Sequence, residues 1–238
     1  MVETRTSLPR ERVMFALELA IEQAVCEYFK TPECIVDIED RIVNPLFYAS
    51  SGIKTDKTDK TGVHWVDGGL NGPEISFGML SKNIIKRCRK LFARNLGLME
   101  KVYLYDKWKP RAHHAVEGNI IDVNSRRMMV HLGDNVQGVM LRCEWVPKEI
   151  SLYRPGAVFR FYVTKILHTS SGVMVYLSRG SKRLPAVLLK EKMPWAGIHV
   201  LRRIRGEKTW VQTRDRIAQD VIEEVRRELN GEIIEIQN

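Results

Sequence analysis

The feature that most restricts the fold of this chain is a set of five short apolar segments within residues 115–179. The segments are rich in β-branched residues, and each break between them contains Asn, Gly, Asp, Pro or Ser. Strands separated by turns show this pattern. Five strands in about 65 residues favour a closed OB-type β-barrel over any helical fold, and barrels of this type commonly bind oligonucleotides.

Composition points the same way. The chain has 238 residues, enough for one to three domains, and a formal net charge of +9, which favours polyanions as partners. Its four cysteines have no paired spacing, so they predict neither a disulfide framework nor a zinc site and suggest a reducing compartment. No apolar run approaches the ~20 residues of a membrane span. A cytoplasmic protein without membrane contact is therefore expected.

The first third of the chain mixes helix and strand. Apolar residues at helical spacing predict a helix that ends before Pro32, and residues 34–43 alternate between apolar and polar side chains, as a half-buried strand does. Residues 51–62 are polar and of low complexity, which predicts a mobile loop. A short hairpin is expected at 62–72.

A second helix is expected at residues 79–97, with a buried stripe that includes Ile84, Ile85 and Leu91. Four cations recur at intervals of four and so share one exposed face: Lys82, Lys86, Lys90 and Arg94. These four residues are called the basic ridge below. Two interpretations remain open: a solvated helix face, or a contact surface for nucleic acid or an acidic protein. After this helix, residues 101–114 are expected to connect to the barrel.

Beyond the barrel, the pattern predicts a compact unit with the order helix, strand, strand, helix, strand. The first helix is expected at 183–193, the two strands meet at a turn at Gly206, and the second helix covers residues 216–229. Asn230 and Gly231 suit the C-terminal cap of that helix.

Three stretches in this order resemble the NusA family of bacterial transcription factors. Residues 7–25, SLPRERVMFALELAIEQAV, are similar to the start of its RNA-polymerase-binding domain. Residues 117–166 resemble its S1 domain, including a Leu-Gly-Asp-Asn turn and an Arg-Pro-Gly turn. Residues 184–195, LPAVLLKEKMPW, and the unit after them are similar to the start of its first KH domain.

This resemblance implies an α+β multidomain fold. An N-terminal α+β domain that binds RNA polymerase is expected at residues 1–108, an OB-type (S1) β-barrel at 109–181 and a C-terminal KH-like α/β unit at 182–238. RNA polymerase and RNA are the implied partners.

The chain also departs from the family. A KH domain clamps nucleic acid with a Gly-x-x-Gly loop between two helices, whereas residues 212–222 contain no such loop and leave room for one helix. Where S1 domains carry stacking aromatics, this chain has Arg126 and Met129, and Leu141 stands where a His is usual. Stacking contributes ~1–3 kcal/mol per base, so we expect weak binding that depends on phosphate contacts.

The candidate RNA-binding residues are therefore basic or polar side chains of the barrel and of the C-terminal strands. They are Arg126, Arg127, His131, Arg142, Arg202, Arg203, Arg205 and Lys208. His131 lies between two apolar residues of a strand, so it is expected to point away from the barrel core. Of the five tryptophans, Trp145 and Trp210 are the alternative stacking residues, and packing is expected for most of the five.

The sequence contains no catalytic constellation, and we expect no enzyme activity, cofactor or metal. Three functions fit the pattern. The first is a NusA-like factor that binds RNA polymerase and nascent RNA and so influences pausing, termination or antitermination. The second is a protein-interaction module that occupies the polymerase site of the cellular factor without useful RNA affinity. The third is an RNA-binding protein of translation or RNA decay.

Overall fold

The computed structural model of the protein describes residues 8–46, 74–170 and 172–237. The loop expected at 51–62 and the hairpin expected at 62–72, which contains Trp65, lie outside the described residues. The chain divides into two compact units, residues 1–100 and 101–238. Within the described ranges, no helix is both long and apolar enough to cross a membrane.

The first unit packs two helices on a small antiparallel sheet. Helix α1 (Arg10–Phe29) is followed by β1 (Glu33–Asp37), β2 (Ile42–Leu46) and β3 (Ile75–Ser76), in the sheet order β1-β2-β3. A 3₁₀ turn, η1 (Phe77–Met79), leads to the second helix. The core is built from small and aliphatic side chains of these elements, among them Ala20, Ala24, Val25, Val43, Ile75, Ile84 and Leu91.

The single strand predicted at 34–43 is in fact a hairpin. Residues 38–41 form its turn, where Arg41 has a positive φ of 58°. The carboxylate of Asp37 accepts the backbone N–H of Asp40 at 2.9 Å, and this bond stabilises the reversal. The alternation of apolar and polar residues continues through both strands, so it did not mark the turn.

Helix α2 (Lys82–Trp108) is longer than the predicted 79–97. Ile84 and Leu91 are buried as predicted, but Ile85 is 37% exposed and does not belong to the stripe. Residues 101–108, predicted as part of a connection, are helical, and they count with the second unit. There Leu104 and Trp108 join the core of the barrel. Another 3₁₀ turn, η2 (Lys109–Arg111), precedes the first barrel strand.

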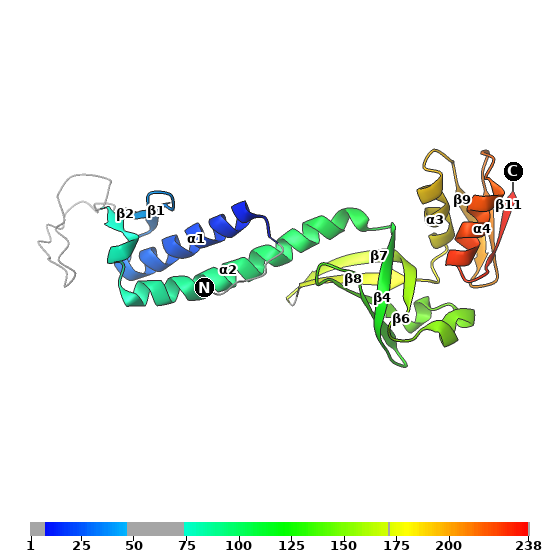
Figure 1. Cartoon of the computed structure of the whole chain (residues 1–238), viewed down its shortest axis with the longest axis horizontal. Coiled ribbons are helices and arrows are strands. Elements are labelled where there is room, and N and C mark those ends of the chain that lie inside the picture. The colour runs from blue at the N-terminus through cyan, green and yellow to red at the C-terminus, as the bar shows by residue number, and fades with distance from the viewer. Residues whose placement is uncertain (1–7, 47–73, 171, 238) are drawn as a thin grey trace, which may run out of the picture. The chain divides into compact units, whose positions relative to one another are not determined.

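The predicted five-stranded barrel is confirmed (Figure 1). Its strands are β4 (Ala115–Val123), β5 (Arg127–His131), β6 (Gln137–Leu141), β7 (Val158–Thr169) and β8 (Gly172–Ser178), closed in the order β4-β5-β6-β8-β7. Two turns, η3 (Arg142–Glu144) and η4 (Pro147–Leu152), lie between β6 and β7. The barrel is tight: a Cβ added at Gly138 would stand 2.4 Å from the buried side chain of Leu177, which would then have to move.

The order helix, strand, strand, helix, strand predicted for the C-terminal unit is confirmed (Figure 1). The elements are α3 (Leu184–Lys192), β9 (His199–Ile204), β10 (Lys208–Gln212), α4 (Gln219–Glu228) and β11 (Ile233–Gln237). Strand β10 lies in the middle of the sheet, antiparallel to β9 and parallel to β11. Side chains of α3 and α4 pack with Val211 and Ile234 in one core. Gly206 and Gly231 have positive φ angles at the predicted turn and cap.

Candidate nucleic-acid interface

Strand β5 carries two of the predicted contacts of the barrel, Arg127 and His131, on its outer face. Met128 and Val130 point into the core, whereas Arg127 and His131 are exposed. Because side chains of a strand alternate between its two faces, the expected outward direction of His131 is confirmed. Met129 lies between Arg127 and His131 on that face and is partly buried.

The structure gathers three of the predicted arginines at one end of β5. The side-chain oxygen of Asn124 accepts the backbone N–H groups of Arg126 and Arg127, each at 3.0 Å, and so shapes the turn before the strand. Arg142 follows β6, and its Nη1 donates to the carbonyl of Ser125 at 3.1 Å. These three arginines are exposed and form no ion pair among the described residues, so they are available to a polyanion.

The second predicted cluster surrounds Trp210 on β10. Arg202 of β9 is its cross-strand neighbour, and the guanidinium carbon lies 5.5 Å from the indole centroid. Lys208 Nζ lies 4.9 Å from the same ring and also pairs with Glu235 of β11. Cations at these distances are attracted to an indole face. The partly exposed Trp210 thus lies beneath two cations and forms one mixed aromatic and basic cluster with them.

Arg203 has a different role from the one expected. Its side chain is 2% exposed, and its guanidinium donates twice to Glu232, at 2.8 Å each. Nη1 of Arg203 also donates to the carbonyl of Arg179 at 2.9 Å. Residues of a strand alternate in direction, so Arg203 turns inward where Arg202 turns outward. We therefore withdraw Arg203 from the candidate interface.

Burial alone raises the pKa of Glu232, but the hydrogen bonds from Arg203, from the Thr209 hydroxyl and from the Gly206 backbone outweigh it. The pKa of this carboxyl is therefore held below its ordinary range. Glu232 is thus ionised at neutral pH, as a buried partner of an arginine must be to balance its charge.

Arg205 remains exposed but is partly engaged. Its Nη1 donates to the carbonyl of Cys143 in η3 at 2.6 Å, so it connects the C-terminal unit with the barrel. Lys208 is half-buried and paired with Glu235.

A buried polar group that was not expected from the sequence joins the barrel to the C-terminal unit. Arg179 is fully buried directly after β8, and its guanidinium makes two bonds to Glu149 of η4. It also donates to the carbonyls of Arg160 in β7, at 2.8 Å, and of Glu228 in α4, at 3.1 Å. Asn230, after α4, donates to the same Glu149 carboxylate at 2.7 Å. These bonds hold α4 against the barrel.

Tyr153 completes this buried group. Its hydroxyl donates to Glu149 at 2.7 Å and accepts the backbone N–H of Val146 at 3.2 Å. Burial, together with the negative charge of Glu149, raises the pKa of Tyr153, so the phenol stays protonated. In the sequence, a charged residue within an apolar segment would be the signal for such a group. Neither Arg179 nor Glu149 stands in such a segment.

The described tryptophans divide by burial. Trp108 and Trp145 are core residues, which removes Trp145 as a stacking candidate. The indole N–H of Trp145 donates to the carbonyl of Met140 at 3.3 Å. Trp195, in the loop after α3, is 75% exposed.

The basic ridge on α2 is exposed at all four positions. Its members form no ion pair among the described residues, whereas the adjacent Arg87 pairs with Glu27 of α1 at 2.6 Å. The hydrogen bond from Arg87 lowers the pKa of Glu27. The ridge therefore presents uncompensated positive charge. Whether a partner contacts it stays a prediction.

The fold thus places the chain among mixed α+β proteins that contain a closed, OB-like five-stranded barrel with a basic surface. Comparison with known proteins adds a likeness to the transcription termination/antitermination protein NusA of Thermus thermophilus, 27% identical over 128 residues. The match covers 52% of this chain and 32% of that protein, so it spans about a third of the relative's length.

No protein-family model matches the chain. Among solved structures, the solution structure of GSP13 from Bacillus subtilis is 18% identical and covers 29% of this chain and 55% of its own. Its TM-score is 0.25.

Proposed function

We propose that this protein is a non-catalytic transcription factor of the NusA type, which binds RNA polymerase and nascent RNA. The observation that carries the proposal is the similarity to a termination/antitermination protein over half of the chain. The barrel supports it, because Arg126, Arg127 and Arg142 converge at one end of β5 without a carboxylate partner among the described residues. Arginine is well suited to phosphate because its planar group donates two parallel hydrogen bonds.

Within this proposal, residues 1–108 bind polymerase near the RNA exit channel, with the basic ridge as a contact surface. The barrel and the KH-like C-terminal unit bind RNA in the cytoplasm and modulate pausing, termination or antitermination. The domain limits at residues 108 and 181 remain predictions within it.

One observation favours the interaction module as a second candidate. The described outer face of β5 and β6 has arginine, methionine, histidine and leucine where stacking aromatics are usual, and a single helix, α4, separates β10 from β11. A protein that competes for polymerase needs no base-stacking surface.

Recovery of polymerase from native lysate and titration of RNA separate the candidates. The full chain carries an affinity tag, and a fluorescent single-stranded RNA of 12 uridines reports RNA binding by anisotropy. We expect the tagged chain both to recover RNA polymerase and to bind RNA. If the chain recovers polymerase but does not bind RNA, it is an interaction module. If it binds RNA but does not recover polymerase, a role in translation or RNA decay is favoured.

A further inference from the structure

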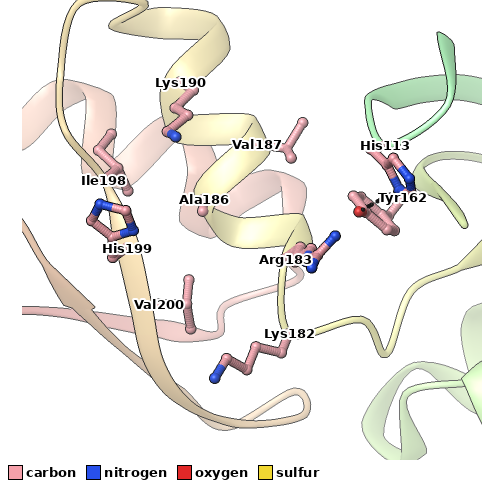
Figure 2. Close-up of a pocket in the computed structure, with 10 residues that line it drawn as sticks. All are labelled: His113, Tyr162, Lys182, Arg183, Ala186, Val187, Lys190, Ile198, His199 and Val200. Atoms are coloured by element: carbon pink, nitrogen blue, oxygen red, sulfur yellow. Dashed lines mark hydrogen bonds between the residues drawn. The ribbon is translucent and has the colours of Figure 1, made fainter. Parts of the chain in front are cut away.

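A basic groove lies between the barrel and the C-terminal unit, and its lining does not include Arg126, Arg127 or Arg142. Its volume is about 330 Å³, near the lower end of the range of roughly 300–1,000 Å³ that is typical of small-ligand sites. Its polar walls are His113, Tyr162, Lys182, Arg183, Lys190 and His199, as Figure 2 shows. Four apolar side chains of α3 and of the segment at β9 line the rest.

The positive charge of this groove is not compensated by its walls. No carboxylate lines it, and Lys182, Arg183 and Lys190 form no ion pair among the described residues. Lys182 Nζ donates to the carbonyl of Leu201, at 3.4 Å. The glutamates nearby are engaged elsewhere, because Glu191 pairs with Arg160, and Glu224 pairs with Lys192.

The spacing along α3 explains why two cations share the groove. Arg183 directly precedes the helix and Lys190 lies seven residues later, so they share one face with Ala186 and Val187 between them. Both cations are exposed, and Ala186 and Val187 form the apolar floor between them, as Figure 2 shows. An anion on that floor meets a cation at each end.

The opposite wall is rigid. The backbone N–H of His113 donates to the carbonyl of Val163 in β7 at 2.9 Å, although its φ of 67° is unusual for a residue other than glycine. Nδ1 of its ring lies 3.1 Å from the hydroxyl of Tyr162, which is itself buried. The bond fixes the ring and leaves Nε2 as the nitrogen that meets a ligand.

We propose that this groove binds the phosphodiester backbone of single-stranded RNA and anchors the strand between the barrel and the C-terminal unit. The inference rests on the proposed RNA-binding function and adds its main contact site. Three cations and a fixed imidazole match the oxygens of adjacent phosphates, and the apolar floor accommodates a sugar. A groove with a volume of about 330 Å³ has room for a short segment of one strand and not for a duplex.

The test uses the full chain and the fluorescent RNA of 12 uridines. The groove variant is Arg183→Gln with Lys190→Gln, and the control is Arg154→Gln with Lys165→Gln. Both pairs are exposed, and both variants lose two of the formal +9 charges, so general electrostatic attraction changes equally. Unfolding midpoints establish that each variant is folded.

Each phosphate contact on a single strand contributes a slope of about 0.7 to the dependence of log K on log salt. We therefore expect the groove variant to bind roughly 25-fold more weakly near 0.1 M salt, with a slope smaller by about 1.4, while the control keeps the original slope. If the two variants lose RNA affinity equally, or if the groove variant keeps its affinity, the groove is not the RNA site, although the protein still binds RNA. An unmodified chain without RNA affinity overturns both.

Lysine acetylation read by mass spectrometry locates the contact independently. The RNA should protect Lys182 and Lys190 and leave Lys165 reactive. The acetylation is repeated with inorganic phosphate and with uridine monophosphate in place of the RNA. If either protects these lysines at the concentration at which the RNA does, the groove is a site for a small anion and the proposal of a strand anchor is wrong.

Discussion

Arg202 and Arg203 are neighbours on β9, yet they have opposite environments. Arg202 lies over the partly exposed Trp210, whereas Arg203 is buried against Glu232. The difference follows from the alternation of side chains along a strand, and the cost of burying an ion explains why the inward arginine needs a carboxylate. A sequence of adjacent arginines is therefore a poor guide to which one meets a ligand.

Replacement of Glu232 by Gln tests this pairing. Removing one partner of a buried ion pair leaves the other charge uncompensated, so we expect the free energy of unfolding at pH 7 to fall by about 3 kcal/mol. Urea unfolding measures this change. The control Glu207→Gln, on the exposed turn between β9 and β10, should leave the midpoint nearly unchanged. An unchanged midpoint for Glu232→Gln would contradict the assigned role.

The pH dependence of stability provides a second check on the same residue. The pKa of Glu232 is lowered in the folded chain, so its contribution to stability is fully present above the unfolded value of about 4.3. This contribution is lost as pH falls through the lowered folded pKa. The difference in the free energy of unfolding between the original chain and Glu232→Gln should therefore shrink as the pH falls below 4. Urea titrations at several pH values measure this difference.

At the scale of elements, the last turns of α2 belong to the barrel rather than to a connection. Leu104 and Trp108 are four residues apart, so they share one helix face, and both lie in the barrel core. Lys107 adds an ion pair to Asp134 at 2.8 Å, and the bond from Lys107 lowers the pKa of that carboxyl. The core of the barrel is thus completed by two residues of α2, which precedes the first barrel strand in the sequence.

Trp108→Ala should therefore destabilise the barrel strongly. Removing a large buried aromatic side chain from a core typically costs about 3–5 kcal/mol, because the cavity does not collapse fully. Val102, on the same helix, is 47% exposed, and Val102→Ala should have little effect. Urea unfolding of both variants measures the difference. Similar midpoints would mean that α2 does not contribute to the barrel core.

At the scale of the whole molecule, the proposed contacts with polymerase and with RNA fall in different compact units. The basic ridge lies in residues 1–100, and the candidate RNA contacts lie in residues 101–238. The first contact surface is a helix face, and the second combines strands, turns and one face of α3. Changes at one surface should therefore affect one partner only.

Two sets of substitutions test this separation. Lys82→Glu, Lys86→Glu and Lys90→Glu together should reduce recovery of RNA polymerase and leave RNA anisotropy titrations unchanged. Arg126→Ala with Arg127→Ala should weaken RNA binding and reduce its salt slope by roughly 1.4, without loss of polymerase. A triple change of Arg154, Lys148 and Lys165 to Glu is the charge-matched control for the ridge. Loss of both partners in either variant would argue against separate sites.

The sequence by itself determined the barrel and the order of elements in the C-terminal unit. Both depend on local signals, namely strand periodicity interrupted by turn residues and a helix stripe ended by Asn230 and Gly231. The outward direction of His131 followed from the same alternation. The single strand expected at 34–43 was wrong because alternation does not reveal a polar turn within it.

Only the tertiary structure decided which charged residues are buried and which surround a groove. Glu149 and Arg179 are 30 residues apart, and His113 meets Tyr162 across 49 residues. Such contacts arise from strand pairing and from the packing of α3 and α4, which no local pattern specifies. The groove was therefore invisible in the sequence, although the α3 spacing of Arg183 and Lys190 was already present there.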